Sequence, residues 1–132
     1  MSPRVTRAAL LAATLSGAPS TVHALARGRS PLEAALAAGA IVTGAERPAA
    51  VRLAAAVPVH LALSLAWTLA LDRVLPPRHG AAWGALAGLA IAALDLGLIG
   101  RRIPAVRALP QAPQVADHVA FGAIAGAALR PS

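Results

Sequence analysis

Residues 53–71 read LAAAVPVHLALSLAWTLAL, without a formal charge, and residues 80–100 read GAAWGALAGLAIAALDLGLIG, where Asp95 is the only charge. A bilayer core needs roughly 20 mostly apolar residues in a helix, so each stretch is long enough to cross it. Pro76 and Pro77 end the first stretch and force the chain to reverse. The two stretches predict an integral membrane protein built of α-helices.

The composition indicates the same class. The chain of 132 residues is 58% hydrophobic and 13% charged, whereas soluble domains are about 25% charged. Every basic residue is an arginine, lysine and asparagine are absent, and alanine, glycine and proline are abundant. This usage is typical of a GC-rich bacterial genome, so we expect a multi-pass protein of the bacterial plasma membrane.

The net charge of +7 does not indicate nucleic-acid binding. The arginines occur singly and in pairs at the ends of apolar segments, where they would face anionic lipid head groups. The sequence shows no basic face with interleaved aromatic residues, so we expect the lipid bilayer and no nucleic acid as partner. The absence of cysteine excludes disulfides and thiolate metal sites.

Three further segments are apolar. Residues 5–26 are interrupted by Ser16-Gly17-Ala18-Pro19-Ser20-Thr21, which we interpret as one broken span; the alternative is a secretory signal peptide cleaved near Ala18. Residues 31–44 are too few for a comfortable span and favour a packed, interfacial or re-entrant helix. Residues 114–129 can cross if the membrane thins or the helix ends snorkel.

The predicted fold is therefore all-α: a polytopic helical membrane protein forming a single transmembrane helical-bundle domain over residues 1–132. It has four principal transmembrane helices near 5–26, 49–71, 80–100 and 114–129, and one short packed or re-entrant helix near 31–44. With four spans, seven of the twelve arginines lie on one side. The positive-inside rule then places the loop 101–113 in the cytoplasm and both termini outside. If 31–44 also crosses, the N-terminus moves inside.

Small and polar residues recur at helical spacing and predict the inner faces of the bundle. The stripes are Ser16/Ser20/His23, His60/Ser64/Thr68, Gly84/Gly88/Ala92/Asp95 and His118/Gly122/Gly126. We expect Gly84, Gly88, Gly122 and Gly126 to be helix-packing residues, because glycine allows backbones to approach closely.

The ionisable residues of these stripes lie at a common depth. At about 1.5 Å per residue, one layer near the cytoplasmic helix ends contains His60, Asp95, Asp117, His118 and, with four spans, His23. We interpret this layer as a structural hydrogen-bond network in which Asp95 pairs with Arg101, Arg102 or His118.

Other interpretations of the layer are a site for a polar ligand or proton, zinc ligation by its histidines and aspartates, and bis-histidine haem ligation. We expect a colourless protein without metal or haem, because the groups can satisfy one another. Trp67 and Trp83 lie near the opposite helix ends, a position that suits either interfacial anchors or side chains packed between helices.

The segments QVADHVAFGAIAG (114–126), LDLG (94–97) and SGAPST (16–21) resemble small multi-pass membrane proteins of actinobacteria. The resemblance implies a multi-pass fold and brings no activity with it. The chain does not resemble small multidrug transporters, which carry a glutamate within the first span, or fluoride channels, which need asparagines.

No serine-hydrolase elbow, zinc-protease motif or phosphate-binding loop occurs in the sequence. We therefore expect a non-enzymatic structural or accessory membrane subunit. Its glycine faces would pack within the bundle, against a second copy or against another membrane protein. The alternative is a small transporter, channel or ion-coupled protein that uses the Asp/His layer.

Overall fold

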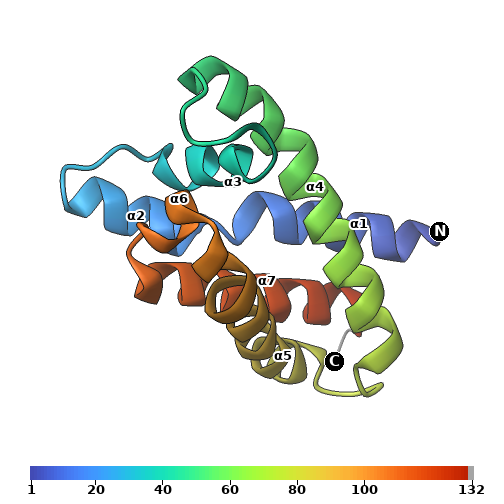
Figure 1. The fold of residues 1–132 in the computed structure, drawn as a ribbon. Helices are drawn as coiled ribbons and strands as arrows, with labels where there is room; N and C mark the ends of the chain where they lie inside the picture. Colours follow the sequence, from blue (N-terminus) through green and yellow to red (C-terminus); the bar gives the residue numbers. More distant parts are fainter. Residues whose placement is uncertain (131–132) are drawn as a thin grey trace.

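The computed structural model describes residues 1–130, which form helices and contain no strand. The prediction of an all-α fold is confirmed for this part of the chain. The helices are α1 (Pro3–Leu15), α2 (Ala18–Ala26), α3 (Glu33–Thr43), α4 (Ala49–Val74), α5 (Gly80–Leu94), α6 (Pro104–Arg107) and α7 (Gln111–Leu129) (Figure 1). A π-helical segment, Asp95–Ile99, and a 3-10 turn, Gly100–Arg102, continue α5.

Three helical segments are long and apolar enough to cross a membrane: Pro3–Ala26, Ala49–Val74 and Gly80–Arg102. The predicted fourth span corresponds to α7, which is 19 residues long and is not among them. Its first half contains Gln111, Gln114, Asp117 and His118, which lower its hydropathy.

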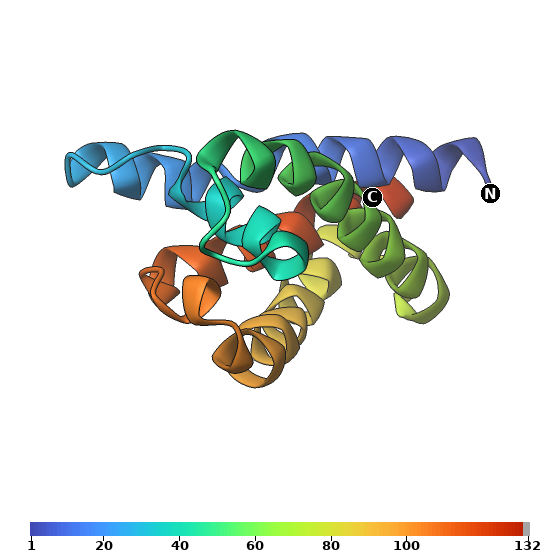
Figure 2. The same cartoon turned by 45° about the horizontal axis from the view of Figure 1, so that its top comes forward.

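The first apolar segment is broken, as its sequence predicts. Helix α1 ends at Leu15 and α2 begins at Ala18, with Pro19 in its first turn. Proline suits this position because the first N–H groups of a helix have no partner within the helix. The two pieces run end to end along one side of the molecule (Figure 2).

Helix α7 lies at the centre, between α1 and α5 (Figures 1 and 2), and contacts α1, α2, α4 and α5. A cluster of charges joins three of these helices at one end of the molecule. Arg130 donates from Nη1 to Asp72 Oδ1 (2.9 Å) and Arg4 donates from Nη2 to the same oxygen (3.1 Å). The start of α1 and the ends of α4 and α7 therefore meet.

Much of the interior is made of small side chains, and large apolar side chains cover much of the surface. Most of the buried apolar residues are alanines, with Ala8, Ala12 and Ala125 at 0% exposure. Leucine, valine and isoleucine side chains point outward on α1 to α5, and no more than 33% of each candidate span is buried. A water-soluble protein has the opposite arrangement, because exposing this much apolar surface to water costs free energy.

Helix α3 lies where a short helix is predicted near 31–44. It packs against the first half of α4 and also contacts α6. A Cβ on Gly39 would overlap the backbone of Arg52, so this glycine sets how closely the two helices approach.

Candidate functional site

The α5–α7 contact holds the polar residues of the bundle in place. A Cβ on Gly84 would overlap the Gly122 carbonyl, and one on Gly126 would overlap the Gly80 carbonyl. One turn further along α5, a Cβ on Gly88 would overlap the His118 carbonyl. The structure thus places all four glycines predicted for packing in one antiparallel contact within the chain, where backbone lies directly on backbone.

This contact brings Asp95 to His118 and Trp67, a set that we call the Asp95 cluster. The Trp67 indole donates from Nε1 to Asp95 Oδ2 (3.1 Å), and His118 Nε2 lies 3.3 Å from the same oxygen. The side chains of Asp95 and His118 are each 21% exposed. Because the residues come from α4, α5 and α7, the cluster ties three helices together.

His118 is held on both sides of its ring. While Nε2 faces Asp95, Nδ1 lies 2.8 Å from the carbonyl oxygen of Gln114, one turn earlier on α7. Both neighbours are hydrogen-bond acceptors, and a neutral imidazole has one N–H only. A doubly protonated ring can donate to both, which would make His118 and Asp95 an ion pair.

The backbone of α5 changes at the same point. The π-helical segment begins at Asp95 and the N–H of Gly100 donates to the Asp95 carbonyl. The π-helical segments of other proteins are short and frequently lie at functional sites. Within residues 1–130 the Asp95 side chain pairs with Trp67 and His118 and makes no ion pair with Arg101 or Arg102.

Asp117 has a different role from its neighbour. Its Oδ1 accepts a hydrogen bond from the backbone N–H of Ser20 (2.8 Å), in the first turn of α2. The carboxylate thus caps the start of α2 across the helix break, where an N–H would otherwise lack a partner. Consecutive residues project about 100° apart around a helix, so Asp117 faces α2 whereas His118 faces α5.

The predicted ionisable layer is therefore divided into separate contacts. His60 Nε2 lies 2.8 Å from the Ala13 carbonyl oxygen of α1, and no hydrogen bond joins it to Asp95 or His118 within residues 1–130. His23 is partly buried on α2. Across these described residues, no three histidine, aspartate or glutamate side chains are placed to share a metal ion.

Of the three pairings proposed for Asp95, the structure shows the one with His118. Of the two roles expected for Trp67, interfacial anchor or packing between helices, its bond to Asp95 favours packing. Trp67 lies seven residues beyond His60 on α4, about 10 Å along the helix axis, which is more than an indole side chain spans. Depth counted along each helix separately omits how the helices are inclined to one another.

The charge cluster at Asp72 has no local pattern in the sequence that predicts it. Asp72, Arg4 and Arg130 are far apart in the chain, and each lies at the end of a helix. The one indication in the sequence is that Asp72 is the single acidic residue on the side that carries five arginines.

Comparison with family models, characterised proteins and solved structures finds no match for this chain.

Proposed function

We propose that this chain is a non-enzymatic integral protein of the bacterial plasma membrane, acting as a structural or accessory subunit. The observation that carries the membrane location is the distribution of side chains: most buried apolar residues are alanines, and large aliphatic side chains are exposed on α1 to α5. Three helices of spanning length support it. Lipid would cover the outward leucines, which water would not solvate favourably.

In this proposal α7 is the fourth span and the most protected one. It contacts α1, α2, α4 and α5, and its polar residues Gln114, Asp117 and His118 are buried or partly buried among them, as polar residues within membranes are. The meeting of Arg4, Asp72 and Arg130 supports a four-span path, because four crossings place the N-terminus, the 72–79 turn and the C-terminus on one side.

In this function the Asp95 cluster holds the helices of the bundle together. The hydrogen bonds of Trp67 and His118 to Asp95 each join different helices, and within residues 1–130 no buried side-chain polar atom lacks a partner. The glycine faces are occupied within the chain. A partner protein would therefore dock on the outward aliphatic surface and not on the glycines.

Gentle extraction from native membranes tests this role. A structural or accessory subunit should co-purify with one membrane protein at a fixed ratio, and chemical crosslinking in intact membranes should give the same pair. A protein that stays monomeric in both experiments, and that fractionates with the membrane, would contradict the subunit role. Recovery in the soluble fraction without detergent would contradict the membrane location.

A second function, proton or cation coupling, is favoured by two observations at the Asp95 cluster. Both nitrogens of His118 face acceptors, and the α5 helix widens at Asp95. In this alternative the His118–Asp95 pair would exchange a proton as the helix changes its hydrogen bonding. Intramembrane ionisable pairs serve such relays in pumps and transporters.

Flux measurements separate the two functions. If the Asp95 cluster only holds the helices together, wild-type protein in sealed vesicles should leave a proton gradient unchanged. A flux that Asp95→Asn and His118→Ala both abolish would favour coupling instead. His79→Ala is the matched control, because His79 is exposed in the turn before α5.

A further inference from the structure

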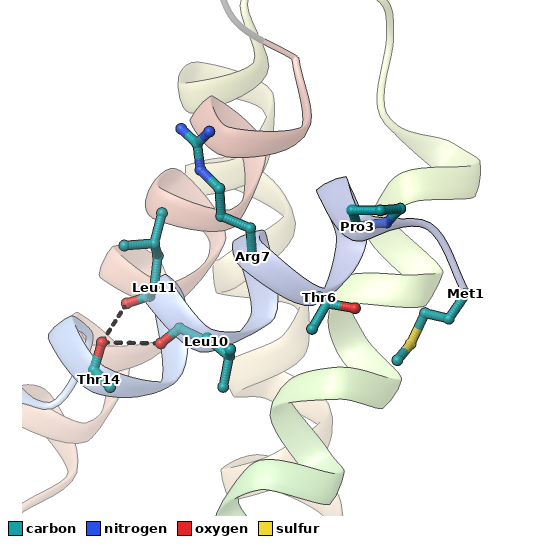
Figure 3. Close-up of a pocket in the computed structure, with 7 residues that line it drawn as sticks. All are labelled: Met1, Pro3, Thr6, Arg7, Leu10, Leu11 and Thr14. Atoms are coloured by element: carbon teal, nitrogen blue, oxygen red, sulfur yellow. Dashed lines mark hydrogen bonds between the residues drawn. The ribbon is translucent and has the colours of Figure 1, made fainter.

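An open groove of about 560 Å³ runs along the outer face of α1 (Figure 3). The groove is shallow and open to the outside and is not an enclosed cavity. Arg7 and Leu11 extend to one side of α1, and Met1, Thr6 and Leu10 to the other. The groove runs along the helix between these two rows of side chains. Arg7 and Leu11 in one row, and Thr6 and Leu10 in the other, are four residues apart.

The inner half of the groove is apolar. Leu10 is 51% exposed and Leu11 is 37% exposed. The Thr14 hydroxyl at the far end donates to the backbone carbonyls of both leucines, at 2.9 Å and 3.1 Å. The hydroxyl proton of Thr14 is therefore not available to a ligand. This half of the groove suits a hydrocarbon chain.

Arg7 places an uncompensated positive charge at the outer half. The neighbouring arginines at this end, Arg4 and Arg130, are both paired with Asp72. Arg7 makes no hydrogen bond or ion pair with any residue that the structure describes. Its guanidinium is free to hold an anion such as a phosphate, which it can bind through two parallel N–H groups.

The depth of these groups matches that of a phospholipid. The broken span Pro3–Ala26 has 24 residues and is about 36 Å long, against a hydrocarbon core of about 30 Å. Arg7 lies about 6 Å in from Pro3 along the helix axis, near the boundary between head groups and hydrocarbon. Leu10 and Leu11 lie one turn deeper, at the level of acyl chains.

We propose that this groove binds one anionic phospholipid, with its phosphate on Arg7 and an acyl chain along Leu10 and Leu11. The inference rests on the membrane location proposed above. Charge favours a lipid over a second copy of the chain, because this end carries five arginines and one aspartate. Two such ends would repel each other, whereas an anionic lipid neutralises the excess charge.

Native mass spectrometry of the purified full-length protein, titrated with lipid in mild detergent, tests the site. The wild type should bind its first phosphatidylglycerol about five-fold more tightly than phosphatidylcholine with the same chains, the effect expected of one basic residue. Arg7→Gln should remove this preference. Arg78→Gln should keep it, because Arg78 is exposed in the 72–79 turn and outside the groove.

Two further variants separate head group from chain. Leu11→Ala should weaken both lipids equally and leave the preference for phosphatidylglycerol intact, whereas glycerol phosphate in solution should displace neither. The proposed site would be overturned if the wild type bound the two lipids equally or if Arg7→Gln kept the preference. It would also be overturned if glycerol phosphate displaced the lipid or if the protein formed a dimer that excludes lipid. Because the protein would still fractionate with the membrane, these results leave the proposed location standing.

Discussion

Asp95 shows how one residue organises the interior of this bundle. The sequence alone predicts that its carboxyl faces protein, because it continues the stripe of Gly84, Gly88 and Ala92, and it names His118 among three partners. It does not predict Trp67, whose indole donates to Asp95 across helices (3.1 Å). Which long side chain reaches a given carboxylate depends on helix tilt and rotation, and a single sequence carries neither.

Replacing Trp67 by phenylalanine should lower the free energy of unfolding by about 0.5–2 kcal/mol, the range measured for hydrogen bonds between membrane helices. Phenylalanine keeps an aromatic ring at this position and removes the N–H, so the loss reports the bond to Asp95 together with the packing lost with the smaller ring. Titration with dodecyl sulfate, followed by circular dichroism, measures the change. Trp83→Phe is the control, since Trp83 is 48% exposed. Equal effects of the two substitutions would show that the bond contributes nothing.

Asp117 contributes through the break in the first span. Asp117→Ala leaves the N–H of Ser20 without its acceptor and should cost about 1 kcal/mol, as the loss of a helix N-cap does. The same titration should show no change for Glu46→Ala, which removes an exposed carboxylate from the loop before α4. A fully stable Asp117→Ala protein would mean that α2 needs no cap.

At the scale of elements, the α5–α7 contact determines the form of the bundle. The four-residue spacing of glycines predicts that each helix has a close-packing face. It does not show that the two faces meet each other, because two glycine stripes on one chain can equally pack against a second molecule. Gly39 was not singled out at all, since one glycine in an alanine-rich helix carries no spacing signal.

Gly84→Ala tests this contact with the smallest change available. The added methyl group overlaps the Gly122 carbonyl, so the helices must separate, at an expected cost of about 1–3 kcal/mol. Gly97→Ala is the matched control on the same span: its new Cβ meets nothing within 4 Å, and stability should be unchanged or slightly higher. Equal melting temperatures of the two alanine variants in detergent would contradict the close contact of α5 and α7 at Gly84.

At the scale of the whole molecule, the chain exposes many large apolar side chains around a core rich in alanine. Sequence predicts the three apolar spans, since length and hydropathy suffice for them, and it predicts the break near Gly17. It predicts α7 less clearly, because a helix at the centre of a bundle can be polar where its neighbours cover it. The ion pairs of Asp72 close one end and join residues that no local pattern connects.

The central claim is that this chain crosses a membrane repeatedly. Cysteine labelling tests it most directly, because the chain contains no cysteine of its own. Arg78→Cys, Leu89→Cys and Arg107→Cys are each exposed to a membrane-impermeant maleimide in sealed vesicles of known orientation. We expect position 107 to react from the cytoplasmic side, position 78 from the opposite side, and position 89 only after detergent is added. Rapid labelling of position 89 in intact vesicles, or of positions 78 and 107 from the same side, would contradict a membrane-spanning α5.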